Sequence, residues 1–131
     1  MHYYALIFTE KPGNESSIAE LMNPFYENDW FDKHNEFIDG DYEYDGTPLP
    51  EFLWDYYTIL ETGPYGYYFQ LASEVTDHHC TTVVLPNGEA KVKKWWDGTE
   101  WHDFTQDFVA DVEKIFMEHP NWYVTAVDYH D

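Results

Sequence analysis

The chain has 131 residues, which suits a single domain with one hydrophobic core, placed here at residues 1–131. Its 26 Asp and Glu residues stand against 6 Lys and no Arg, so the formal net charge is −20. Nucleic acid and anionic membranes repel such a chain, whereas basic surfaces attract it. High net charge favours disorder, but aromatic residues make up 21% of the chain, and their rings bury large areas. The composition therefore predicts a folded, acidic domain.

The sequence also bears on the compartment. One cysteine, Cys80, excludes an internal disulfide framework. The first four residues carry none of the basic character of a secretory signal, and no apolar run approaches the roughly 18 residues of a membrane span. We therefore expect a soluble protein of the cytoplasm.

The first quarter of the chain gives clear signals. Residues 3–8 are β-formers and predict a buried strand. Asn14 is expected to cap a helix over residues 15–23, which Pro24 ends.

Residues 26–62 give weaker signals. Acids alternate with other residues over 39–46, which fits either a strand with an acidic face or a solvated loop. A short helix is expected over residues 51–57, after Pro50, and a strand over residues 65–71.

The strongest local signal is a hairpin. Residues 81–85 and 89–96 are rich in β-formers and flank Pro86-Asn87-Gly88, a typical hairpin turn. Asp97-Gly98 marks a second turn. Trp95 and Trp96 point to opposite faces of a strand, so one ring is expected to be exposed at an interface.

The last part predicts a helix over residues 102–118 and a closing strand over residues 122–129, separated by Pro120. The apolar stripe of this helix consists of Phe104, Phe108, Val109, Val112, Ile115 and Phe116. The order of elements predicts an α+β fold: a single antiparallel sheet that contains the first and last strands, with two main helices on one face, ferredoxin-like or a variant of it.

Charge is distributed unevenly along the chain. Residues 36–79 contain ten acids and no lysine, and residues 100–131 contain eight acids and one lysine. Residues 80–99 contain two acids and three lysines. Such asymmetry favours a binding role over general solubility.

Two rows of acids have regular spacing. Asp103, Asp107 and Asp111 recur every four residues, about 6 Å apart on one face of the expected helix. In an extended chain, alternate residues from Asp39 to Asp45 share a face at roughly 6.7 Å intervals. Either spacing resembles the phosphates of a nucleic-acid strand, which Lys and Arg of a partner would grip. The residues nominated as partner-binding are Asp39, Asp41, Glu43, Asp45, Glu51, Asp55, Asp103, Asp107 and Asp111. A solvated acidic face and adaptation to high salt are the alternatives.

Metal motifs are incomplete. Asp41, Glu43 and Asp45 begin a calcium-loop pattern, but its twelfth position is Phe52 instead of Glu. On a strand, His78 and Cys80 would share a face, yet two ligands fall short of a structural zinc site. The other histidines that could converge, His102, His119 and His130, have no metal-ligand spacing. We therefore expect no metal and no cofactor, and a buried, inert Cys80.

No catalytic motif is present. The sequence contains no phosphate-cradling glycine loop, no H-E-x-x-H and no G-x-S-x-G, and it has no arginine to bind phosphate or carboxylate substrates. A non-enzymatic protein is expected.

Three short segments carry a resemblance. Residues 2–8 (HYYALIF), 21–28 (LMNPFYEN) and 54–57 (WDYY) resemble the "HYA-L-V", "L-x-P-Y/F-x-E-N" and "W-D-W-Y" segments of small acidic accessory proteins of tailed bacteriophages. The glycine-arginine-tryptophan stretch that commonly follows in those proteins is replaced here by residues 58–60 (TIL). The resemblance covers about the first half of the chain and implies a phage accessory protein. Phage proteins of this charge include DNA mimics that block restriction, repair or CRISPR machinery.

Together these features predict an acidic protein that binds a basic, nucleic-acid-handling protein of the host as a DNA-mimic inhibitor, of the anti-defence or anti-restriction type. It should bind neither nucleic acid nor membranes directly. The alternative is a phage structural or assembly adaptor whose acidic surface serves solubility.

Overall fold

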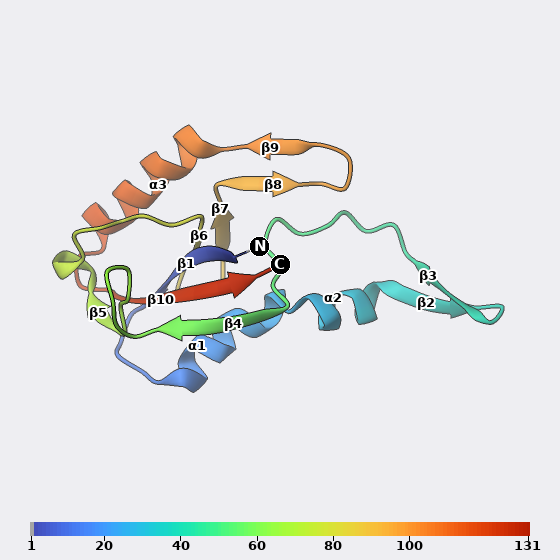
Figure 1. Ribbon diagram of the computed structural model, residues 1–131, viewed down its shortest axis with the longest axis horizontal. Coiled ribbons are helices and arrows are strands. Elements are labelled where there is room, and N and C mark those ends of the chain that lie inside the picture. The colour runs from blue at the N-terminus through green and yellow to red at the C-terminus, as the bar shows by residue number, and fades with distance from the viewer. Residues whose placement is uncertain (1) are drawn as a thin grey trace.

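The computed structural model describes residues 2–131 and shows a mixed α+β architecture, in which helices pack on a mostly antiparallel, open sheet (Figure 1). The helices are α1 (Glu15–Met22), α2 (Glu27–His34) and α3 (Thr105–Glu118), with 3₁₀ turns η1 (Asn23–Phe25) and η2 (Ala72–Glu74). The strands are β1 (His2–Thr9), β2 (Asn35–Ile38), β3 (Asp41–Tyr44), β4 (Tyr56–Leu60), β5 (Gln70–Leu71), β6 (Thr82–Val84), β7 (Ala90–Val92), β8 (Lys94–Trp96), β9 (Trp101–Asp103) and β10 (Tyr123–His130).

The main sheet is organised around its first and last strands. Its strand order is β4-β10-β1-β6-β7, and the short β5 also pairs with β10. β1 and β10 run antiparallel over their whole length, from the pair His2–His130 to the pair Thr9–Tyr123. β6 is parallel to β1, and the other pairings are antiparallel. The expectation that the first and last strands lie inside the sheet is confirmed.

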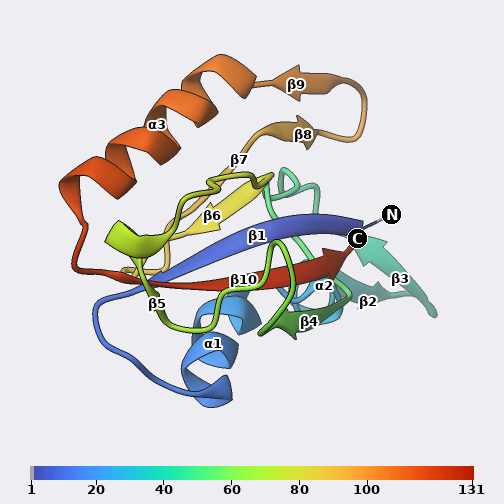
Figure 2. The ribbon, with the colours of Figure 1, turned by 60° about the vertical axis from the view of Figure 1, so that its left-hand side comes forward.

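Helices cover both faces of this sheet (Figure 2). Leu6 and Phe8 of β1 pack in the core beneath α3, whereas Ala5 and Ile7 pack in the core against α1. The expected placement of two main helices on one face, as in a ferredoxin-like fold, is therefore wrong. The physical reason lies in β1 itself, where residues 5–8 are an unbroken apolar run. Such a run needs cover on both sides, and all four residues are fully buried.

The α1 helix begins as expected. The Asn14 side chain accepts hydrogen bonds from the backbone amides of Ser16 and Ser17 at 3.0 and 3.3 Å. These bonds satisfy donors that the first turn of a helix leaves free. The helix ends at Met22 and is followed directly by η1, which contains Pro24.

Both expected turns in the second half are confirmed. Asn87-Gly88 joins β6 to β7, with Gly88 at a positive φ of 90°. Asp97-Gly98 lies in the loop between β8 and β9. Because β9 takes residues 101–103, α3 starts three residues later than its sequence pattern indicates, and Val109 of the predicted stripe is exposed.

The middle of the chain departs from expectation. Residues 51–55 are irregular instead of helical, because Trp54 forms a β-bridge with Tyr26, directly after η1. Its backbone amide donates to the Phe25 carbonyl at 3.0 Å, and its buried indole Nε1 donates to the Met22 carbonyl at 2.7 Å. The strand expected over residues 65–71 is limited to β5.

β2 and β3 form a two-stranded hairpin that projects from the body, on the right of Figure 1. In the described part of the chain these strands pair only with each other. Their turn is Asp39-Gly40, and both residues have positive φ, 51° and 88°, as a two-residue type I′ turn requires. Residues 35–45 are called the arm below.

Candidate functional site

An acidic groove runs between α3 and the β6–β7 hairpin. Its volume is about 280 Å³, and its charged lining residues are Glu51, Glu89, Lys91, Asp107 and Asp111. Val92, Phe104 and Phe108 supply apolar walls. A second hollow of about 250 Å³ shares Glu89, Lys91 and Asp111, so the two adjoin along α3. Three of the nominated residues, Glu51, Asp107 and Asp111, therefore meet in one place, although 56 positions separate Glu51 from Asp107.

The groove keeps most of its negative charge. Lys91 Nζ lies 3.5 Å from Asp111 Oδ2, and both side chains are substantially exposed. Exposed pairs of this kind contribute roughly 0–1 kcal/mol. Four carboxylates against one ammonium leave an excess of acid beside an aromatic wall. A guanidinium or ammonium group of a partner would find carboxylates to pair with and a ring to lie against.

The third member of the helical row has a different role. Asp103 is the last residue of β9, and its side chain accepts hydrogen bonds from the Thr105 backbone amide at 2.9 Å and from the Thr105 hydroxyl at 2.5 Å. These bonds from Thr105 hold the pKa of Asp103 below its usual value. The expected row of three on one helix is therefore reduced to Asp107 and Asp111.

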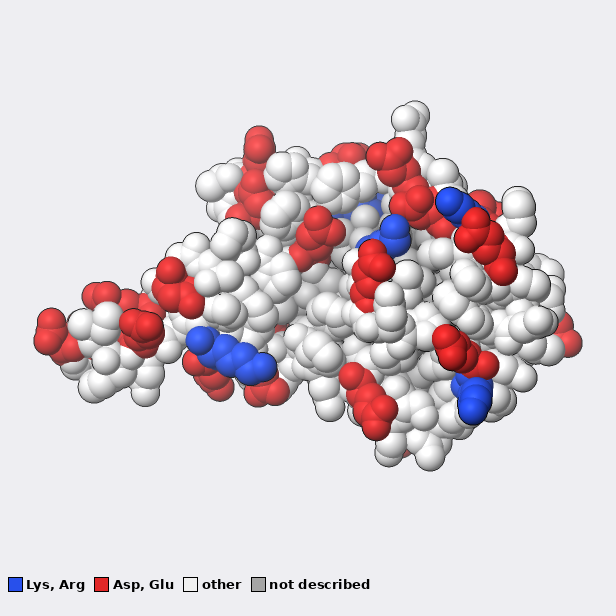
Figure 3. Space-filling view, turned by 180° about the vertical axis from the view of Figure 1, so that it is seen from behind, with Lys and Arg blue, Asp and Glu red and all other residues white. Residues whose placement is uncertain are grey.

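The row expected over residues 39–45 is also broken. Asp41 and Glu43 share one face of β3, but Asp39 lies in the turn and Asp45 lies beyond the strand. Seven of the nominated acids thus occupy two separate places: Glu51, Asp107 and Asp111 line the groove, and Asp39, Asp41, Glu43 and Asp45 belong to the arm. Asp and Glu side chains gather around the tip of the arm at the left of Figure 3.

Asp45 fastens the base of the arm. Its carboxylate lies 2.8 Å from His34 Nδ1 and accepts a hydrogen bond from the Thr47 amide at 2.8 Å. Its own amide donates to the His34 carbonyl at 2.7 Å. Hydrogen bonds from Thr47, reinforced by His34, lower the pKa of Asp45 to about 2.

Asp55 lies apart from both acidic places. Both of its carboxylate oxygens lie within 2.9 Å of His130 Nδ1, beside the paired chain ends. Burial, followed by the charges of Asp131 and Asp55, raises the pKa of Glu27. At this corner Asp55 pairs with His130, and the negative charges of Asp55 and Asp131 act on Glu27.

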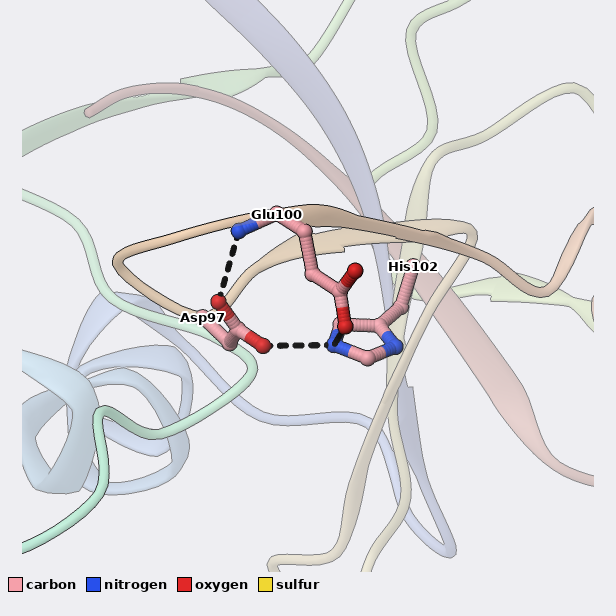
Figure 4. Close-up of side chains that lie close together, drawn as sticks. All are labelled: Asp97, Glu100 and His102. Carbon is pink, nitrogen blue, oxygen red and sulfur yellow. Dashed lines mark hydrogen bonds and ion pairs between the residues drawn. The ribbon is translucent and has the colours of Figure 1, made fainter.

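Asp97, Glu100 and His102 place one possible ligand atom each within 4.8 Å of one another (Figure 4). Asp97 already accepts hydrogen bonds from the backbone amides of Thr99 and Glu100, both at 2.8 Å, and lies 2.7 Å from His102 Nε2. The His102 bond, followed by those from the turn, holds the pKa of Asp97 far below its usual range. The cluster is the hydrogen-bonded turn between β8 and β9.

The other metal-type residues do not assemble. His78 lies against Glu113 at 2.8 Å, and Cys80 is buried, with a thiol pKa that desolvation raises to about 12. His119 stacks on Trp122, and His102 and His130 have their own carboxylate partners. The calcium-loop pattern that begins at Asp41 folds as strand β3.

Sequence reasoning missed Glu89 of the groove and the aromatic side of the arm. Glu89 follows the Asn87-Gly88 turn, so the hairpin signal already placed it beside the next strand. The Asp39-Gly40 turn carried the same kind of hairpin signal. The acids that flank this turn are evident in the sequence, whereas the pairing of Phe37 with Tyr42 follows only from the strand register.

Within residues 2–131, no helix has the length and apolar character needed to cross a membrane. Comparison with protein-family models, with curated proteins and with solved structures finds no match. The resemblance to acidic bacteriophage proteins therefore rests on its short motifs alone.

Proposed function

We propose that this protein is a non-enzymatic inhibitor that binds a basic, nucleic-acid-handling protein and occupies the surface on which that protein holds nucleic acid. The carboxylates of the acidic groove take the place of phosphates. Lys and Arg side chains of the partner pair with them, and association is fast and sensitive to salt.

The observation that carries this proposal is the convergence of Glu51, Asp107 and Asp111 on one groove. Like charges close together cost folding free energy, and Asp107 and Asp111 are one helical turn apart. Glu89 adds a fourth carboxylate, and Lys91 is the one lysine among the groove's lining residues. A partner that supplies cations would relieve this repulsion.

The phage resemblance supports a narrower form of the proposal. In that form the protein acts in the host cytoplasm against a defence system such as restriction or CRISPR machinery. The net charge of −20 supports a partner evolved to hold a polyanion.

A second candidate function is the phage assembly adaptor. It is favoured by the exposed pair Trp96 and Trp101 on the β8–β9 hairpin, whose rings lie 5.5 Å apart. Exposed tryptophans are frequent anchors of protein interfaces. An adaptor that binds through them would depend little on salt.

The test compares two triple variants with the wild type. E51Q/D107N/D111N removes three charges from the groove, and E10Q/E20Q/E61Q removes three exposed charges that do not line it. Each protein is immobilised, exposed to bacterial lysate and eluted with a sodium chloride gradient. We expect the wild type and the control to retain a basic nucleic-acid-binding protein, and the groove variant to bind it about tenfold more weakly, which equals about 1.4 kcal/mol.

The adaptor function predicts a different result. Retention would then survive both triple variants and high salt, and it would be lost in W96A/W101A. Equal retention by the groove variant and the wild type would contradict the proposed inhibitor.

A further inference from the structure

The arm has two chemically different faces. The pair Phe37–Tyr42 and the neighbouring Tyr44 lie on one face, because residues directly opposite in an antiparallel hairpin share a side. The pair Glu36–Glu43 and Asp41 lie on the other face, together with Ile38. One side of the arm is therefore aromatic and the other carries carboxylates.

The aromatic face is open. Phe37 is 66% exposed and Tyr42 is 77% exposed, and their ring centroids lie 5.2 Å apart. Among the described residues, neither ring belongs to the packing of the main core. The two side chains contribute little to the packing of the body, and exposed apolar side chains that lie together are typical of an interaction surface.

The acidic face destabilises the arm. Glu36 and Glu43 are a directly opposed like-charge pair, which weakens a hairpin, and two strands alone are marginal in water. The base is nevertheless held firmly, since Asp45 binds His34 and the His34 ring lies 4.3 Å from the Trp30 ring. The arm therefore has an anchored base and a charge pattern that a cationic surface would stabilise.

The net charge of the chain indicates the kind of partner that can bind the arm. A second copy carries 26 acids against 6 lysines and would repel it, and so would nucleic acid. The occupant must offer cations for the carboxylates and flat apolar or aromatic surface for the rings. Proteins that bind single-stranded nucleic acid offer this combination, because a positive groove follows the backbone while aromatic side chains stack on the bases. Readers of duplex DNA use cations and base-edge contacts instead.

We propose that the arm docks in the nucleic-acid groove of a single-strand-binding protein. Phe37 and Tyr42 lie on the aromatic platforms as bases do, and Glu36, Asp41 and Glu43 pair with the lysines and arginines that hold phosphates. This inference rests on the proposed function and names the class of its partner.

The experiment uses two purified probes. One is an OB-fold single-strand-binding protein holding a fluorescent oligothymidylate, and the other is a homeodomain holding a fluorescent duplex. Displacement of each nucleic acid by the full-length protein is followed by fluorescence anisotropy. We expect the protein to displace the single strand at least tenfold more effectively than the duplex.

Three variants localise the effect. F37S/Y42S should displace the single strand at least tenfold less effectively, whereas M117S, which removes a side chain 80% exposed on α3, should match the wild type. E36Q/D41N/E43Q should also displace it less effectively, yet the amides of its arm should be better protected from hydrogen exchange, because the opposed charges are gone. Lost binding together with a firmer arm separates a binding role from misfolding.

The outcomes distinguish the inference from the proposed function. Equal displacement of both nucleic acids, or unchanged displacement by F37S/Y42S, would overturn the docking role of the arm and leave groove-based inhibition standing. Displacement of neither nucleic acid would likewise overturn the docking role of the arm, and the proposed function would still be decided by retention of the groove variant.

Discussion

Several carboxylates of this chain pair with its own histidine side chains. Among the residues described, five of the seven histidines lie within 2.9 Å of an Asp or Glu oxygen. The pairs are His2–Asp128, His34–Asp45, His78–Glu113, His102–Asp97 and His130–Asp55. Acids held in this way stabilise turns and chain ends. The acids of the groove and of the acidic face of the arm have no histidine partner of this kind.

Asp45 gives a prediction about pH. The folded protein lowers the pKa of Asp45 to about 2, from an unfolded value of about 3.9. A lowered pKa stabilises the folded form above the unfolded value, and the contribution disappears as the pH falls through the folded value. D45N should therefore weaken hydrogen-exchange protection of the amide of residue 45 at pH 7. The loss should shrink between about pH 4 and pH 2, below which wild type and variant should match. A loss of equal size at every pH would contradict this role of the carboxylate.

At the scale of the element, α3 depends on its buried face. Phe116 is buried, packs edge to face on Phe8 with centroids 5.2 Å apart, and lies parallel to the His78 ring at 3.7 Å. The adjacent Met117 points outward and is exposed. α3 therefore packs on the sheet through one buried face, and Asp107 and Asp111 lie outside that face, where they line the groove.

The matched pair F116A and M117A tests this packing. F116A should lower the free energy of unfolding by about 3–5 kcal/mol, because it removes a buried ring and leaves a cavity. M117A should change it by less than about 0.5 kcal/mol, as exposed substitutions do. Urea unfolding followed by circular dichroism measures both, and similar losses in the two variants would show that α3 packs by a different face.

Elements with strong local signals were predictable from the sequence. Asn14 as a cap, Asn87-Gly88 as a turn and the buried runs of β1 and β10 each have a local cause, and each is where the sequence indicates. The short helix expected over residues 51–57 was wrong because a tertiary contact, the burial of Trp54 against η1, overrides local propensity.

The candidate site was predictable only in part, for the same reason. Spacing placed Asp107 and Asp111 on one face of a helix, but only the fold brings Glu51 and Glu89 beside them. Asp103 belonged to the same periodic pattern, yet its side chain accepts a hydrogen bond from the Thr105 amide at the start of α3. The aromatic face of the arm depends on the register of β2 with β3, which composition does not reveal.

For the whole molecule, the groove and the arm are two separate acidic places on a scaffold with cores on both sides of its sheet. The groove lies between α3 and the β6–β7 hairpin. The arm projects away from the body of the molecule (Figure 1). A partner that engages both must be larger than a single pocket and must carry cations over an extended surface. A nucleic-acid-binding channel has these properties.

Competition across a salt series tests the central claim most directly. The basic protein retained by the immobilised chain is purified, saturated with a fluorescent nucleic acid and titrated with this protein from about 50 to about 500 mM sodium chloride. Mimicry of nucleic acid predicts full displacement at low salt, with an inhibition constant that rises steeply and log-linearly with salt. Binding that proceeds without displacing the nucleic acid, and that hardly changes with salt, would contradict the claim and leave the adaptor function in its place.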